Sequence, residues 1–279
     1  MKVLTQENKV PILMYHSLSS SATPGFRQFT VSPALFSEQM AFLHRHHYTP
    51  LTVTQFVNAR SKGASALAEH PVILTFDDGF ADFFTGALPV LKQYNFTATL
   101  YITTAFIGGS SRWMRREKET TRRMLSWQQV REIAKNGIEC GAHTHTHPQL
   151  DTLSAGAARD EMAQSKELLE DHLGQAVSSF AYPYGYQTAR LRQLARETGF
   201  TSACAVKHAK SSITADAFCL PRLMVRADAS LDTFVALLEQ GAALPLAAAH
   251  AFYLRARTPA WQLVRRSSAP LTRYLQGGL

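Results

Sequence analysis

Short apolar runs alternate along the chain with segments of helical periodicity. The predicted strands cover residues 10–16, 71–76, 98–104, 138–142, 177–182, 201–206 and 219–225. Predicted helices lie between them: one after Ser32, one over 87–94, one from Ser126, one from Ser154 to Gly174, one ending at Gly199 and one from Ser230. Ser126 with Gln129 matches the capping box that starts a helix. Strands that alternate with helices favour a parallel sheet, so the sequence predicts an α/β fold.

Two adjacent carboxylates follow the most apolar of these runs, PVILTF, where a strand should become a loop. Asp77 and Asp78 are rarely tolerated beside buried residues unless they are paired or bind a metal. Gly79 permits a sharp turn that would bring both into one cavity. The alternative is a solvated Asp-Gly turn, which is the commoner structure for these residue types.

Three histidines follow another predicted strand. His143, His145 and His147 lie within five positions of the segment GAHTHTHPQL, and imidazole and carboxylate are standard zinc ligands. In a helical turn His143 and His147 share a face and His145 points away, whereas an extended segment would put all three on one face. We favour the helical turn because Pro148 stops a strand ladder, and because two histidines plus a carboxylate leave positions open for water.

The ordered set TFDDGF, H-T-x-T-H-P and FAYPYG resembles the polysaccharide deacetylases of the NodB-homology group, carbohydrate esterase family 4, from about residue 10 to about residue 240. The resemblance implies a deformed barrel of about seven parallel strands. It also implies that Asp77 is the general base and that Asp78, His143 and His147 hold a divalent metal. Zinc is expected first, with cobalt, nickel and manganese as alternatives. The family supplies an oxyanion-stabilising backbone N–H from the position of Tyr184.

The general acid of this family normally comes from a Leu-x-His motif near the C-terminus, and the chain has no such motif. Its later histidines, His208 and His250, do not match that pattern. His16 ends the strand-like run VPILMYH, a signature of the branch resembling poly-N-acetylglucosamine deacetylases. We therefore assign His16 as the general acid, against the commoner structural role of a lone strand-end histidine.

A second departure concerns an arginine that many members carry two residues before the motif proline, where this chain has Ala181. Arg222, in the run CLPRLMV, is a candidate to pair with Asp77 instead. The alternative is that Arg222 is a surface arginine on an edge strand. His16, Asp77, Asp78, His143, Tyr184 and Arg222 all fall at or near the C-terminal ends of predicted strands, where barrel enzymes keep their chemistry.

The length of 279 residues and the 46% apolar content suit one α/β barrel. We assign residues 1–240 to the catalytic barrel and 241–279 to a basic tail, which is either a helix docked on the barrel or an amphipathic segment on a membrane surface. A second basic stretch, 108–125, could rim the site and meet an anionic substrate or a membrane, although a solvated face is commoner.

The net charge of +8 comes without any nucleic-acid-binding motif, so no nucleic-acid partner is predicted. Cys140, Cys204 and Cys219 fall in predicted strands without metal-ligand spacing and are expected to be small buried apolar residues. The first residues do not match a secretion signal, and no segment matches a membrane span, which favours a cytoplasmic protein with peripheral membrane contact at most. The oligomeric state is left open.

The expected function is metal-dependent removal of N-acetyl groups from an N-acetylated sugar or polysaccharide precursor. Two alternatives remain: a related C–N hydrolase acting on a non-sugar amide or a formyl group, and a carbohydrate-binding remnant of the fold without catalysis.

Overall fold

Seven parallel strands form the central sheet of the computed structural model, which describes residues 9–227 and 229–241. In spatial order the strands are β10 (Ser202–Cys204), β9 (Ser179–Ala181), β8 (Glu139–Ala142), β7 (Thr99–Ile102), β6 (Pro71–Phe76), β2 (Ile12–Tyr15) and β12 (Leu223–Met224). An eighth strand, β5 (Thr49–Leu51), pairs with β6 at Pro71–Ile73. The sheet curls, and a parallel bridge between Cys204 and Leu220 joins its two ends. The predicted deformed barrel is confirmed.

The first barrel strand along the chain, β2, is internal to the sheet rather than at an edge. Leu13 of β2 is in register with Leu74 of β6 on one side and with Leu223 of β12 on the other. The first and last strands of the barrel along the chain are therefore neighbours in space. Since every pairing of these strands is parallel, their C-terminal ends gather at one end of the barrel.

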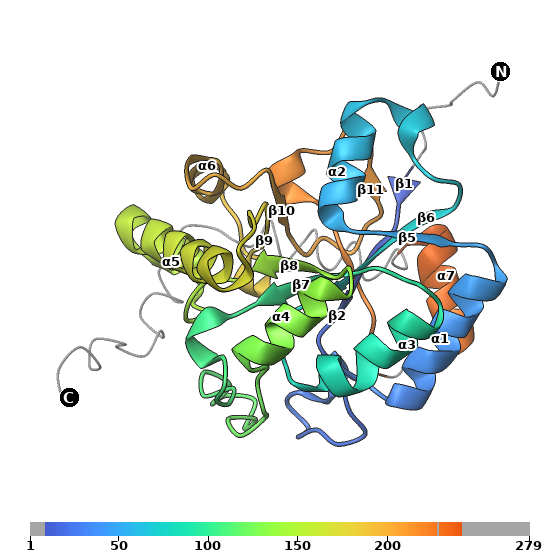
Figure 1. Ribbon diagram of the computed structural model, residues 1–279, viewed down its shortest axis with the longest axis horizontal. Coiled ribbons are helices and arrows are strands. Elements are labelled where there is room, and N and C mark those ends of the chain that lie inside the picture. Colours follow the sequence, from blue (N-terminus) through green and yellow to red (C-terminus); the bar gives the residue numbers. More distant parts are fainter. Residues whose placement is uncertain (1–8, 228, 242–279) are drawn as a thin grey trace.

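Helices lie outside the strands (Figure 1). They are α1 (Pro33–Arg45), α2 (Val53–Ser61), α3 (Leu88–Gln93), α4 (Trp127–Lys135), α5 (Ala155–Leu173), α6 (Ala189–Glu197) and α7 (Leu231–Gln240). The predicted boundaries hold where a cap was identified. Ser126 and Gln129 form a reciprocal capping box, and Gly174 ends α5 with a left-handed φ of 66°.

Several elements were not predicted from the sequence: the short strands β3 (Ser17–Leu18), β4 (Thr30–Val31) and β11 (Ser211–Ser212), and a strand and a helix near residue 50. The pair β5–α2 occupies residues 49–61, and Thr52 with Gln55 forms a second capping box there. This T-x-x-Q pattern was a usable signal. The predicted helix over 87–94 begins earlier than expected, because a π-helical turn over Phe83–Ala87 precedes α3.

The core fills the space between strands and helices with apolar side chains. Tyr15, Phe36 and Phe76 pack together with ring centroids 5.1–5.8 Å apart, and all three are fully buried. The three cysteines are buried as expected, and the structure has them free; Cys219 lies in a 3-10 turn (Ala217–Cys219) rather than in a strand. The predicted tail lies outside the described residues from position 242 onward. No helix in the described ranges is long and apolar enough to cross a lipid bilayer.

Candidate active site

The two adjacent carboxylates lie in a left-handed turn directly after β6. The Asp77 N–H still donates to Tyr15 O of β2 at 3.0 Å, so the ladder continues one residue past the strand. Asp78 then takes a φ of 77° and Gly79 a φ of 83°. A Cβ atom at Gly79 would lie 3.3 Å from Ile102 Cγ2, which adds a steric reason for glycine there. Both aspartates are nearly fully buried, so the solvated-turn alternative is excluded.

The histidine segment is neither helical nor extended, which corrects our preference for a helical turn. His143 continues the β8 ladder, its N–H donating to Ile102 O at 3.0 Å. Thr144 and His147 then take positive φ angles of 67° and 60°, and Thr144 Oγ1 accepts the His147 N–H at 3.1 Å. His143 and His147 still face the same centre. As expected, His145 points elsewhere, with its Nδ1 2.9 Å from Thr104 Oγ1.

Asp78, His143 and His147 bring three ligand atoms within 4.8 Å of one another. His143 Nδ1 donates to Ala181 O at 2.7 Å, which leaves the Nε2 lone pair facing Asp78 Oδ1 at 3.6 Å. His147 Nε2 lies 3.2 Å from the same oxygen. One carboxylate and two imidazoles, three mostly buried groups around one point, fit a divalent cation and leave further coordination positions open.

The ionisation of these groups suits metal binding. Burial lowers the pKa of His143 to about 4, despite the nearby Asp77 carboxylate, so its imidazole is neutral at neutral pH. Burial alone would raise the pKa of Asp78, but the hydrogen bond and charge of His147, followed by His16 and His143, lower it to about 2. The site therefore combines an anionic oxygen with a neutral nitrogen donor, the forms that ligate a cation.

Arg222 pairs with Asp77 through two hydrogen bonds. Its Nη1 donates to Asp77 Oδ1 at 2.6 Å and its Nη2 to Oδ2 at 2.7 Å. Arg222 is fully buried, with Nε donating to Ala205 O at 3.3 Å and the guanidinium 5.5 Å from the ring centre of Tyr101. The surface-arginine alternative is therefore wrong. Burial would raise the pKa of Asp77, but Arg222, with His143, lowers it overall.

The position of Arg222 in its strand also differs from the prediction. It precedes β12 instead of lying at the C-terminal end of a strand. The register of Leu223 with Leu13, and of Leu13 with Leu74, sets the Arg222 backbone level with Ile73, four residues before Asp77. Its side chain thus reaches Asp77 from inside the barrel, and Thr75 Oγ1 accepts from its Nη1 at 3.2 Å on the way.

His16 follows β2 directly and lies close enough to the centre to interact electrostatically with Asp78, Asp77, Arg222 and His147. Burial lowers the pKa of His16, and the two aspartates oppose that effect. Its ring lies 5.0 Å from the ring of Phe29, measured between centroids. The structure thus brings the lone N-terminal histidine together with the aspartates and His147.

Tyr184 occupies the short turn Pro183–Gly185 with φ 59° and ψ 5°. The residue is 47% exposed, and its ring centroid lies 4.8 Å from that of His147. A Cβ atom at Gly185 would come within 2.6 Å of Val206 Cβ, so the turn packs too tightly against the segment after β10 for any larger residue. The PYG segment therefore borders the candidate metal site.

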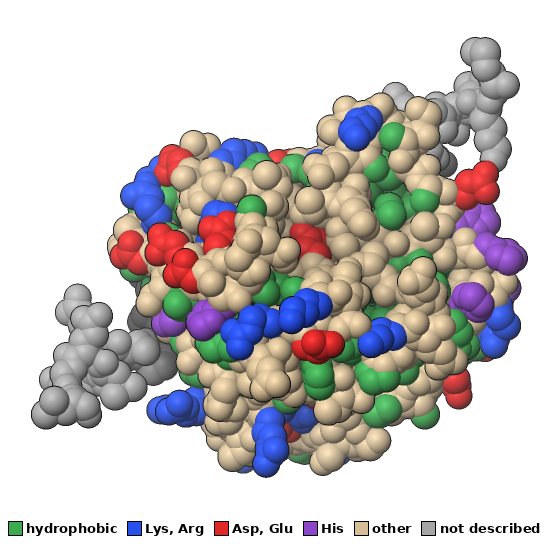
Figure 2. Space-filling model, viewed as in Figure 1, with side chains coloured by type: hydrophobic (Ala, Val, Ile, Leu, Met, Phe, Trp, Pro, Cys, Tyr) green, Lys and Arg blue, Asp and Glu red, His purple; other side chains and the backbone are tan. Residues whose placement is uncertain are grey.

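The basic stretch 108–125 also borders the site, through a residue that was not singled out in the sequence. The indole of Trp113 lies 5.4 Å from the ring of His147 and 4.6 Å from that of Phe106. No local sequence pattern around Trp113 indicates that this stretch folds back against His147. Figure 2 shows Lys and Arg side chains on the lower part of the visible face, where Figure 1 has the loop that contains Trp113.

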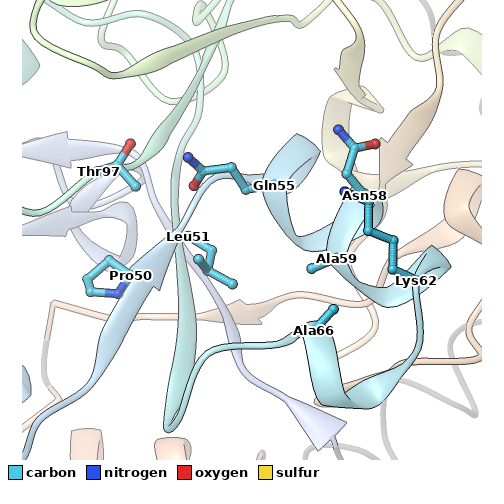
Figure 3. Close-up of a pocket in the computed structure, with 8 residues that line it drawn as sticks. All are labelled: Pro50, Leu51, Gln55, Asn58, Ala59, Lys62, Ala66 and Thr97. Atoms are coloured by element: carbon cyan, nitrogen blue, oxygen red, sulfur yellow. The ribbon is translucent and has the colours of Figure 1, made fainter.

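A separate cavity of about 500 Å³ lies between β5 and α2 (Figure 3). Its lining includes Leu51, Gln55, Asn58 and Lys62, together with Thr97 just before β7. Neither the two aspartates, nor the clustered histidines, nor Arg222 line this cavity. The candidate active site is therefore the strand-end cluster and not this cavity.

Comparisons with known proteins agree with this geometry. The profile of the family described as polysaccharide deacetylase matches residues 64–203. A Bacillus subtilis (strain 168) protein, YxkH, which carries a provisional polysaccharide deacetylase name, is 30% identical over 233 residues, 83% of this chain and 76% of its own length. The chain belongs to the polysaccharide deacetylase family.

Two further relatives extend the likeness over most of the chain. The poly-β-1,6-N-acetyl-D-glucosamine N-deacetylase of Staphylococcus aureus is 23% identical over 248 residues, 82% of each chain. The deacetylase PplD of Streptococcus pyogenes, solved in complex with acetate, superposes with a TM-score of 0.72 at 26% identity, covering 83% of this chain and 98% of PplD. The likeness of this polysaccharide deacetylase family member to PplD therefore extends well beyond residues 64–203.

Proposed function

We propose that this protein is a metal-dependent hydrolase that removes N-acetyl groups from an N-acetylated saccharide. The observation that carries the proposal is the convergence of Asp78, His143 and His147 beside an Asp77 that Arg222 holds ionised. Zinc is the expected ion, since two imidazoles and one carboxylate with open positions are typical of catalytic zinc. When bound, a divalent cation lowers the pKa of water from about 15.7 towards about 7 and polarises a carbonyl oxygen.

Asp77 acts as the general base in this proposal. Arg222 occupies both of its oxygens, and this contact fixes the orientation of the carboxylate and favours its ionised form. His143 Nε2 lies 3.9 Å from Asp77 Oδ2, so the base adjoins the ligand set. Asp77 accepts the proton that the attacking water gives up as the new C–O bond forms.

His16 acts as the general acid. An amine leaves an amide carbon only when its nitrogen gains a proton, and His16 lies within electrostatic reach of Asp77, Asp78 and His147. The Tyr184 backbone N–H stabilises the negative charge that develops on the carbonyl oxygen. Its support is the location of the PYG turn beside His147.

The relatives support the proposed substrate class. The Staphylococcus aureus protein is named for deacetylation of a poly-N-acetylglucosamine, and PplD was solved with acetate. We propose a saccharide bearing acetamido groups for this chain too, acted on without a nucleic-acid partner. A cytoplasmic location and peripheral membrane contact through 241–279 belong to the same proposal, as does the assignment of 1–240 to the catalytic unit.

The decisive experiment measures acetate release from a panel of acetylated saccharides, with metal content determined in the same samples. The panel includes N-acetylated non-sugar amides and formamides. Acetate released from saccharides, in proportion to bound metal, supports the proposal. Turnover confined to non-sugar amides or formyl groups would overturn the saccharide assignment, and metal-loaded protein without any turnover would indicate a remnant that only binds carbohydrate.

A further inference from the structure

Arg122, in the stretch 108–125, connects this stretch with the loop after β2 and with the segment that follows the Asp77–Asp78 turn. Its Nη1 donates to Ser17 Oγ at 2.9 Å and lies 3.6 Å from Asp82 Oδ2. Its Nη2 donates to Ser21 O at 3.0 Å and to Glu119 Oε2 at 3.3 Å. Ser17 is next to His16, and Asp82 follows the Asp77–Asp78 turn. In Figure 1 the loop after β2 and the loop before α4 both lie below the sheet, where Arg122 joins them.

One face of the Arg122 guanidinium begins a row of aromatic rings that leads to His16. The guanidinium carbon lies 5.1 Å from the ring centre of Phe26. Phe26 lies 5.6 Å from Phe29, and Phe29 lies 5.0 Å from His16, both measured between ring centroids. The His16 ring is therefore held on this side by a packed row that ends at Arg122.

A second row leads from Arg122 to His147. The guanidinium carbon lies 5.8 Å from the ring centre of Phe80. Phe80 stacks on Trp113 with centroids 6.2 Å apart and planes 14° from parallel, and Trp113 lies 5.4 Å from His147. Phe26 and Phe80 also touch each other edge to face at 5.6 Å. Arg122 is thus the shared contact of two rows of rings, one of which ends at His16 and the other at His147.

We propose that Arg122 is a positioning residue that fixes the spacing between the His16 and His147 side chains. The catalytic consequence rests on the proposed function, in which His16 is the acid and His147 a metal ligand. A planar guanidinium suits this place because it can stack on rings and form several directed hydrogen bonds at once. A lysine ammonium would keep the charge beside Asp82 and Glu119 but lose the flat contact.

The test compares Arg122→Met and Arg122→Lys with Arg112→Met, a control at an exposed arginine of the same stretch. Three properties are measured: kcat and KM on an acetamide substrate and on an activated aryl acetate, metal content, and the NMR resonances of the histidine rings in protein labelled with ¹⁵N-histidine. The ring resonances are assigned with His16→Ala and His147→Ala.

Both Arg122 variants are expected to keep the metal and KM, and to shift the His16 and His147 ring resonances. Their kcat on the amide should fall roughly tenfold, because misplacing a catalytic group by an ångström can lower the rate by as much as ~10²-fold. Their kcat on the aryl acetate should fall less. Arg112→Met should match the unmodified protein. Unchanged ring resonances, or full activity in Arg122→Lys, would overturn the proposal.

Failure of the proposed function gives a different result. If His16→Ala damages amide and ester hydrolysis equally, His16 is not the acid. The ring resonances of the Arg122 variants still decide whether Arg122 positions the two histidines. If Arg122→Met does not fold, the milder Arg122→Lys gives the same decision.

Discussion

Asp77 and Arg222 are 145 residues apart in the chain, yet the guanidinium of one meets both carboxylate oxygens of the other at 2.6 and 2.7 Å. Both side chains are buried, at 3% and 0% exposure. A planar guanidinium that forms two hydrogen bonds to a carboxylate fixes the orientation of the carboxylate and also supplies a positive charge. A lysine ammonium with a single hydrogen bond would supply the charge without fixing the orientation. In the proposed mechanism Arg222 therefore orients the base, a role that Ala181 cannot fill.

Breaking this pair should change the pH dependence of the reaction. Arg222→Met removes a charge that lowers the pKa of Asp77, so burial then raises that pKa. A base works only when ionised, and the acid limb of the kcat/KM profile should therefore move to higher pH while metal content stays constant. Arg190→Met, at an exposed arginine on α6, is the control. An acid limb that stays in place would contradict the role of Arg222.

The same variant should lose stability. Arg222→Met leaves the Asp77 carboxylate buried without its partner, a change that typically costs about 3–5 kcal/mol. The pKa of Asp77 is lowered in the folded protein, so the ionised pair stabilises at neutral pH and its contribution is lost as pH falls through the lowered pKa. Urea unfolding at neutral and at acidic pH measures this effect. The free energies of unfolding of the variant and the unmodified protein should differ less in acid than at neutral pH.

Metal binding should depend on two of the three clustered histidines. His143→Ala and His147→Ala remove ligand atoms that lie 3.6 and 3.2 Å from Asp78 Oδ1, so both should lose stoichiometric metal and activity together. His145→Ala is the matched control, because His145 contacts Thr104 instead. Elemental analysis of purified protein measures the outcome. Full metal occupancy in either of the first two variants would rule out the ligand set.

The two aspartates should separate base from ligand. Asp77→Asn should keep the metal but lose turnover by about 10²–10⁴-fold, the usual contribution of a positioned proton-transfer group. Asp78→Asn should lose metal as well, since its oxygen is the one that both histidines face. Kinetics and metal analysis on the same preparations give the answer, and identical behaviour of the two variants would count against these roles.

His16→Ala should affect amides more than activated esters. An amine needs a proton to leave, whereas a phenolate of low pKa leaves without one. The ratio of amide to aryl acetate turnover should therefore fall, with metal content unchanged because His16 is outside the ligand set. Equal losses on the two substrates would direct the search for the acid to His145 or His208.

The sequence predicted the strands and the residues at their ends because apolar runs and clustered ligand types are local signals. It did not predict the left-handed Thr144 and His147, since non-glycine residues adopt positive φ only where surrounding contacts select it. The path of Arg222 through the barrel depends on which strands close the sheet, and the contact of Trp113 with His147 depends on how a long loop folds back. Neither is encoded in neighbouring residues.

The internal place of β2 has a consequence for synthesis of the protein. Among the barrel strands β2 leaves the ribosome first, but its partner β12 and Arg222 emerge only after more than 200 further residues, counted from Ile12 to Leu223. Until then β2 lacks one neighbour, and Asp77 is a carboxylate without its cation. Pairings between such distant segments form slowly because of the entropy of closing the loop. A nascent chain that stops short of Leu220 therefore contains Asp78, His143 and His147, but neither the bridge that joins the two ends of the sheet nor the arginine that pairs with Asp77.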